Sequence, residues 1–138
     1  MKSLVYLLMI FCAASCKKEN VKVKNPDVDL SKIYGKWNWV NSTGGIAGLT
    51  ITPKTAGYNM SVEYRINKSV YFFRNDTLQN QAKFAIVKGN SIFSVDPAYI
   101  IKYDPDGMDH VIIKAKKDTL ILADNVNDGF TILYVKQK

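Results

Sequence analysis

Hydrophobic and polar residues alternate with a period of two along most of this chain. The clearest run, residues 59–66, carries its apolar side chains on one face: Met60, Val62, Tyr64 and Ile66. This pattern is typical of a strand with one buried face. Similar runs recur about every eight to twelve residues between turn-forming residues. The predicted strands are residues 36–41, 59–66, 69–74, 81–87, 91–95, 99–103, 110–116, 119–123 and 130–137.

These runs predict one all-β domain over residues 27–138. Consecutive strands with short turns favour a single antiparallel meander, and closing it into a small barrel of about eight to nine strands removes its exposed edges. Residues 29–34 predict a short helical turn, which Gly35 ends. In the first strand, Trp37, Trp39 and Asn41 are expected on one face. Turns are expected at 88–90 and a break at 96–97, because Gly and Pro interrupt strands.

The first fifteen residues have a different pattern. Lys2 precedes an apolar run over residues 4–11, and small residues follow at 13–15. The run is about half the roughly 20 residues that a transmembrane helix needs, so residues 1–15 are predicted to be a secretory signal peptide.

Cys16 follows this leader directly, and the segment 13–16 resembles the signal of bacterial lipoproteins. The resemblance implies that Cys16 is lipidated and becomes the first residue of the mature chain. Cys12 fits this role poorly because Phe11 precedes it where a small residue is required. Residues 17–26 lack a core-forming pattern and are predicted to be a flexible tether.

What the formal net charge of +7 implies depends on where the charged residues lie in the chain. Five of the basic residues lie in the leader and tether, and residues 27–138 hold 14 basic and 11 acidic side chains. A net charge of +3 spread over a domain forms no basic stripe, so we expect no nucleic-acid binding. The tether lysines instead favour contact with anionic lipid.

Few residues suggest catalysis or metal binding. His110 is the single histidine, and its place at the start of a strand after Asp109 predicts a surface residue. The acidic residues Asp104, Asp106 and Asp109 do not fit the spacing of a calcium loop, and a turn explains them. The segment 124–129 fails the same test. We therefore expect no enzyme, no metal and no cofactor.

Two features suggest binding of a small molecule. Gly44, Gly45 and Gly48 lie in a loop that is either a lid over a ligand or a passive connection. Aromatic side chains are numerous, and they either line an apolar cavity or simply fill the core. The candidate lining residues are Tyr64, Phe72, Tyr99, Tyr103 and Tyr134.

Gly35-Lys36-Trp37, placed after a short helical turn, resembles the Gly-x-Trp signature of lipocalins. In that family a basic residue of the last strand packs over the tryptophan, and Lys136 holds the matching position. Gly35, Trp37 and Lys136 are thus the expected barrel-closing clamp. The segments 35–48 and 120–130 further resemble lipocalin-like lipoproteins of Bacteroidetes.

This resemblance covers residues 29–138 and implies a lipocalin-like barrel, but it does not fix a function. The first hypothesis is a membrane-anchored binding protein, expected to be a monomer, that takes up a small hydrophobic ligand in the cell envelope. The second is an interaction or structural lipoprotein whose barrel is filled. We expect the outer membrane and its periplasmic face, since Lys17, Lys18 and Glu19 give no strong acidic run after Cys16.

Overall fold

A computed structural model of the chain describes residues 25–138. The predicted signal peptide, the predicted lipidation site Cys16 and the predicted tether up to residue 24 lie outside the described residues. No helix within the described range is both long enough and apolar enough to cross a membrane.

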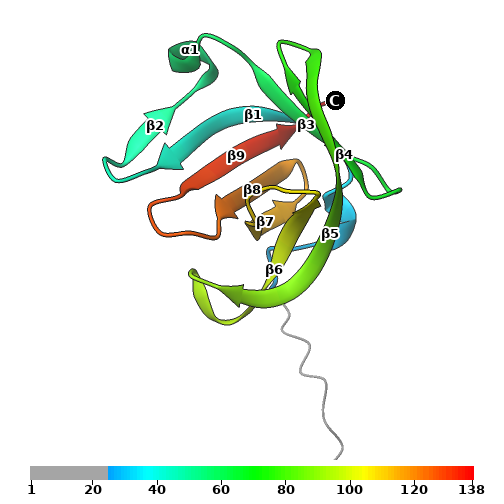
Figure 1. The fold of residues 1–138 in the computed structure, drawn as a ribbon, viewed down its shortest axis with the longest axis vertical. Coiled ribbons are helices and arrows are strands. Elements are labelled where there is room, and N and C mark those ends of the chain that lie inside the picture. The colour runs from blue at the N-terminus through cyan, green and yellow to red at the C-terminus, as the bar shows by residue number, and fades with distance from the viewer. Residues whose placement is uncertain (1–24) are drawn as a thin grey trace, which may run out of the picture.

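The chain forms an eight-stranded antiparallel barrel with one additional strand, as Figure 1 shows. The strands are β1 (Gly35–Gly44), β2 (Leu49–Ile51), β3 (Met60–Tyr64), β4 (Ser69–Arg74), β5 (Thr77–Ser91), β6 (Ser94–Asp104), β7 (His110–Lys116), β8 (Thr119–Asp124) and β9 (Phe130–Lys136). Two short helices accompany them, η1 (Leu30–Lys32) and α1 (Pro53–Ala56). The predicted all-β meander is confirmed.

β9 returns to β1 and closes the sheet. The pairing begins with Trp37 opposite Lys136 and ends with Gly44 opposite Phe130. The other edge of β1 is shared, because β3 pairs with its first half and β2 with its last three residues. β2 is therefore the extra strand, and the remaining eight make the barrel.

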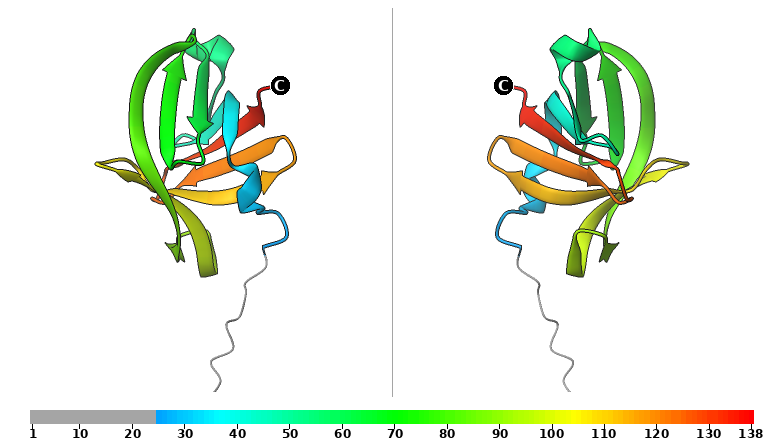
Figure 2. Two further views of the ribbon diagram at one scale, coloured as in Figure 1. Left: turned by 90° about the vertical axis from the view of Figure 1, so that its right-hand side faces the viewer. Right: turned by 90° about the vertical axis from the view of Figure 1, so that its left-hand side faces the viewer.

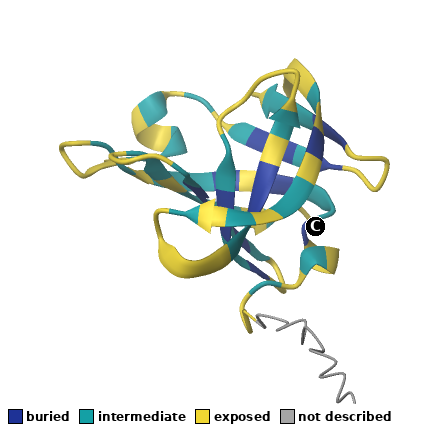
Figure 3. Ribbon diagram, turned by 60° about the horizontal axis from the view of Figure 1, so that its bottom comes forward, coloured by how far each residue is buried: buried dark blue, intermediate teal, exposed yellow. Residues whose placement is uncertain are grey.

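The end of the barrel next to η1 is packed with apolar side chains. Trp37, Val70 and Leu120 are fully buried there, and Ile33 covers them from the segment that follows η1. The side chain of Trp37 donates from Nε1 to the carbonyl oxygen of Ile33 over 2.7 Å, which fixes this segment to β1. In Figure 3 the buried positions lie on the strands, where exposed positions also occur, and most of the connections are exposed.

The predicted helical turn at residues 29–34 is confirmed as η1. Asp29 caps it, because its carboxylate accepts hydrogen bonds from the backbone N–H and the hydroxyl of Ser31. These two bonds lower the pKa of Asp29.

A β-bulge between Trp39 and Asn41 changes the face that the second half of β1 presents. Trp37 and Trp39 lie on one face as predicted, and both are buried. Asn41 does not lie on the same face as Trp37 and Trp39, because one extra residue at the bulge reverses the alternation. Ser42 takes that place, and its hydroxyl accepts a hydrogen bond from Nε1 of Trp39 over 3.0 Å.

The predicted turn at 88–90 and break at 96–97 are wrong. β5 continues through residues 88–90 to Ser91, and β6 continues through Pro97. Gly89 is paired with Ala98, and the register shifts only after it, where Asn90 of β5 stands opposite residues 95–97 of β6. Pro97 is tolerated because the pairing of β6 with β7 involves only Ile100 and Ile101, so the missing N–H of Pro97 leaves no ladder bond unmade on that side.

Two further predictions fail locally. Ile66 was expected to face the core, but β3 ends at Tyr64 and Ile66 is 81% exposed in the turn that follows. The segment 49–56, for which the sequence predicts no strand or helix, contains β2 and α1. α1 is held by a capping box in which Thr52 and Thr55 bond each other's backbone N–H.

The beginning of the described chain occupies an open edge of β7. Asp29 donates its backbone N–H to the carbonyl of Ala115 over 2.8 Å, and Ala115 donates to the carbonyl of Asp27 over 2.9 Å. Val28 thereby forms a parallel bridge with Ala115. This edge is free because β6 and β7 share only two residue pairs, so the N-terminal segment completes the wall where the barrel is weakest.

Candidate functional site

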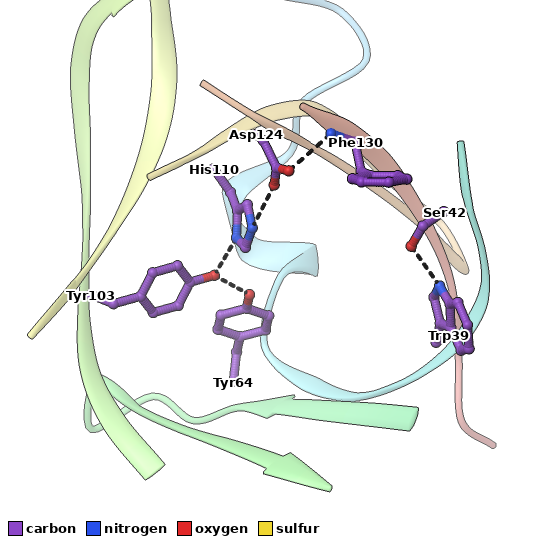
Figure 4. A network of polar contacts seen from close by, with 7 residues as sticks. All are labelled: Trp39, Ser42, Tyr64, Tyr103, His110, Asp124 and Phe130. Carbon is purple, nitrogen blue, oxygen red and sulfur yellow. Dashed lines mark hydrogen bonds and ion pairs between the residues drawn. The ribbon is translucent and has the colours of Figure 1, made fainter. Parts of the chain in front are cut away.

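Four polar side chains from four strands form one chain of contacts inside the barrel, drawn in Figure 4. The hydroxyls of Tyr64 in β3 and Tyr103 in β6 lie 2.7 Å apart. The Tyr103 hydroxyl lies 2.9 Å from Nδ1 of His110 in β7, and Nε2 of His110 lies 3.2 Å from Oδ1 of Asp124 in β8. Oδ2 of Asp124 accepts the backbone N–H of Phe130 over 2.9 Å. We call these four side chains the polar chain.

The direction of the hydrogen bonds follows from the Asp124 end. The carboxylate is an acceptor, so Nε2 of His110 carries the proton that faces it. Burial lowers the pKa of His110, so the ring is neutral at pH 7 and Nδ1 is an acceptor. Tyr103 then donates to Nδ1 and accepts from Tyr64. Burial raises the pKa of both tyrosines, which keeps their hydroxyls protonated.

A pocket of about 230 Å³ opens beside the polar chain. Tyr103 and His110 contribute to its wall, and Phe72, Ala82 and Met108 add apolar surface. Asn80, Asp106 and Gly107 complete its lining. We call this hollow the mouth pocket. An apolar wall with a few fixed polar groups is the usual composition of a small-molecule site.

Packing and hydrogen bonding both fix Tyr103 in this wall. Its ring lies 5.9 Å from that of Phe72 and 5.4 Å from that of His110, the latter edge to face. Tyr64 below it packs edge to face on Phe84 at 5.1 Å. The polar groups of the mouth pocket are therefore pre-positioned, which lowers the entropy cost of binding.

The five predicted lining residues do not act as one group. Phe72 and Tyr103 line the mouth pocket, and Tyr64 bonds to Tyr103 from the core side. Tyr134 on β9 is half-buried and packs against the core. Tyr99 lies elsewhere, in a separate hollow with Pro26 and Lys88.

Gly35, Trp37 and Lys136 lie together where β1 meets β9. The Lys136 ammonium is 5.0 Å from the Trp37 ring centroid and donates to the carbonyl of Tyr34 over 3.1 Å. A Cβ at Gly35 would lie 3.1 Å from Cε of Lys136, and Gly35 has a φ of +123°. Glycine is therefore needed here both for the backbone conformation and for the lysine stem.

The three glycines of the candidate lid loop lie in an ordered hairpin turn. Gly44 pairs with Leu49 and with Phe130, while Gly45 and Gly48 have positive φ values of 74° and 60° in the turn itself. Gly45 donates its N–H to the carbonyl of Gly129 over 3.3 Å. The lid function stays a prediction.

The prediction that His110 is a surface residue is wrong. Its side chain is 16% exposed and that of its partner Asp124 is 13% exposed. One signal was available in the sequence, because His110 stands two residues before the buried Ile112 and thus on the same face of β7. Asp124 was considered only as a calcium ligand, and the register that pairs it with His110 was not predictable.

The acidic loop residues lie where turns need them. Asp104 ends β6 and Asp106 lies in the connection to β7, while Asp109 accepts a hydrogen bond from Lys102 over 2.8 Å. Within residues 25–138, no group of three or more His, Cys, Asp or Glu side chains is arranged to hold a metal ion.

Comparison with known proteins adds no family to this description. No protein-family model matches the sequence, no curated protein matches it, and no solved structure matches the fold. The closed eight-stranded antiparallel barrel is consistent with a lipocalin-like fold.

Proposed function

We propose that this protein is a lipocalin-like, membrane-anchored lipoprotein that binds a small hydrophobic ligand in the mouth pocket. The observation that carries the proposal is the pairing of an apolar wall, made by Phe72 and Met108, with the fixed polar groups of Tyr103 and His110. In this proposal the protein binds its ligand without catalysing a reaction, uses no cofactor and is a monomer.

The volume of the pocket limits the size of the ligand. About 230 Å³ is below the roughly 300–1,000 Å³ of sites for drug-sized molecules. The opposite end of the barrel is filled by Trp37, Leu120 and their neighbours. We therefore expect either a ligand smaller than a drug molecule or one end of a longer chain whose remainder stays outside.

A fluorescent probe tests the pocket directly. We would titrate the purified protein with the neutral apolar dye N-phenyl-1-naphthylamine and compare Ala82→Phe with Ala85→Phe. Ala82 lines the mouth pocket, whereas Ala85 is an exposed residue on the other face of the same strand. The dye should bind the wild type and Ala85→Phe but lose most of its affinity for Ala82→Phe.

The filled end of the barrel favours one alternative, an envelope protein that acts through its surface and takes no ligand. Failure of the wild type to bind the dye, together with no molecule that co-purifies from a lipid extract, would support that alternative. If Ala82→Phe and Ala85→Phe bind the dye equally well, the dye binds outside the mouth pocket.

The anchoring part of the proposal is supported by the sequence of residues 1–16 and is tested separately. Mass spectrometry of the mature N-terminus should find acyl chains on Cys16, and Cys16→Ser should release the protein from the membrane fraction. We place the protein on the periplasmic face of the outer membrane, so protease treatment of intact cells should leave it uncut.

A further inference from the structure

The turn between β5 and β6 exposes a group of apolar side chains. Ile92 and Phe93 are 52% and 48% exposed, and Val95 at the start of β6 is 105% exposed. We call these three residues the apolar tip. Apolar side chains that cluster on the surface of a small domain often mark an interaction site.

Hydrogen bonds hold the apolar tip against the neighbouring β8–β9 loop. The Asn125 side chain donates to the carbonyl of Asn90 over 3.2 Å and accepts the backbone N–H of Ile92 over 3.1 Å. Val126, the next residue of that loop, is itself 43% exposed. The tip is thus fixed in place and presents its apolar side chains outward.

The described chain begins beside this hairpin. Asn25 and Pro26 line a hollow of about 260 Å³ together with Ser94, Asp96 and Pro97 of β6. Figures 1 and 2 show the first described residues next to the lower part of β6, close to where β5 and β6 meet. The backbone bonds between residues 27–29 and Ala115 keep this segment at that place.

The chain that precedes Asn25 limits the distance from the membrane. Nine residue steps separate Cys16 from Asn25, and fully extended they reach about 30 Å. Within this stretch four lysines stand against one acidic residue, Glu19: Lys17, Lys18, Lys22 and Lys24. Such a segment is attracted to the headgroups of anionic lipids, which draws the entry point of the domain toward the bilayer.

We infer that the apolar tip inserts into the interface of the anionic bilayer that holds the lipid anchor. The inference rests on the proposed lipidation of Cys16 and is independent of ligand binding. Acyl chains alone hold the domain near the membrane without fixing its orientation. The tip adds a second contact that orients the barrel, because apolar side chains at a membrane interface are stabilised by burial at the boundary between headgroups and acyl chains.

Depth-dependent quenching tests this inference. The lipidated full chain would be placed in vesicles of phosphatidylethanolamine and phosphatidylglycerol with brominated acyl chains. Phe93→Trp reports on the tip, and Ile46→Trp is the matched control. Ile46 is 92% exposed on the β1–β2 turn, which Figure 1 places well apart from the start of the described chain. The native Trp37 and Trp39 are buried and give a constant background.

Brominated lipid should quench the emission of Phe93→Trp strongly and leave that of Ile46→Trp unchanged. Val95→Trp is a second reporter, to be used if Phe93→Trp does not fold. Equal quenching of tip and control variants, or none, overturns the inference. So does a Phe93→Trp emission shift that depends on protein concentration without vesicles, since a second copy would then cover the tip. Mass spectrometry of the same sample separates the causes, because an unacylated Cys16 refutes the anchoring and the tip inference together.

Discussion

Removing one hydroxyl from the middle of the polar chain should destabilise the protein more than removing one from its end. Tyr103→Phe takes away the group that accepts from Tyr64 and donates to His110. The Tyr64 hydroxyl and Nδ1 of His110 are then both left without their partner. Each buried polar group that loses its partner costs about 1–3 kcal/mol, so the expected loss for the two groups is about 2–6 kcal/mol.

Tyr64→Phe is the matched control. The change has the same shape, and the side chain of Tyr64 is fully buried. It removes only the terminal donor, so Tyr103 still donates to His110 and the expected loss is about 1 kcal/mol. Urea denaturation followed by circular dichroism measures both values, with the m-value checking that each variant unfolds in two states.

Comparing the stabilities of Tyr103→Phe and Tyr64→Phe can refute the prediction. If Tyr103→Phe is no less stable than Tyr64→Phe, the hydroxyl of Tyr103 does not link the two groups, and the inferred order of donors and acceptors is incorrect. A loss of several kcal/mol is a large fraction of the roughly 5–15 kcal/mol that stabilises a small domain, so the effect is easily measured.

Three further predictions follow from the described contacts. Because burial lowers the pKa of His110 below the roughly 6.5 of the unfolded chain, the neutral ring favours folding above that pH and this contribution is lost as the pH falls through the folded pKa. Urea midpoints should therefore fall on acidification below pH 6.5, and less so in His110→Gln; an equal fall in both would contradict this. Lys136→Met should cost about 1–2 kcal/mol, since it removes the cation over Trp37 and the bond to the Tyr34 carbonyl, and an unchanged melting temperature would refute the clamp. Gly44→Ala should cost about 3 kcal/mol or more, because the new Cβ would collide with the carbonyl oxygen of Gly129, whereas Gly48→Ala meets open space and should cost only about 1 kcal/mol for its positive φ. Thermal unfolding of the pair decides this, and similar losses would mean that β1 and the β8–β9 loop are not in contact.

The alternation of side chains predicted the barrel because most strands here have one buried face. Met60, Val62 and Tyr64 face inward as the period of two requires, and Trp37 lies opposite Lys136 in the closing pair. Patterns of this kind depend only on local residues, so they can be recognised without knowing the partner strand.

The errors arise where a partner or a bulge overrides the local pattern. Nothing local to Asn41 encodes the bulge that puts Ser42 in its place beside Trp39. Pro97 predicts a break, but β6 tolerates it because β7 does not pair there. Both outcomes are set by contacts between segments that are distant in the sequence.

The candidate site was predicted only in part for the same reason. Tyr64, Phe72 and Tyr103 were predicted as lining residues because the chain is rich in aromatic residues, and the structure brings these three together. His110 and Asp124 were not predicted as site residues, because it is the register between β7 and β8 that brings their side chains together. A chain of hydrogen bonds across four strands has no signature in any one of them.

The most direct test of the account is the nitrogen spectrum of the His110 ring, which is easily assigned because the chain has one histidine. At pH 7 we expect a neutral ring with the proton on Nε2 and Nδ1 as an acceptor, and a change in the Nδ1 signal when N-phenyl-1-naphthylamine saturates the protein. A protonated or freely exchanging ring, or a signal that the bound dye leaves untouched, would contradict the proposed site.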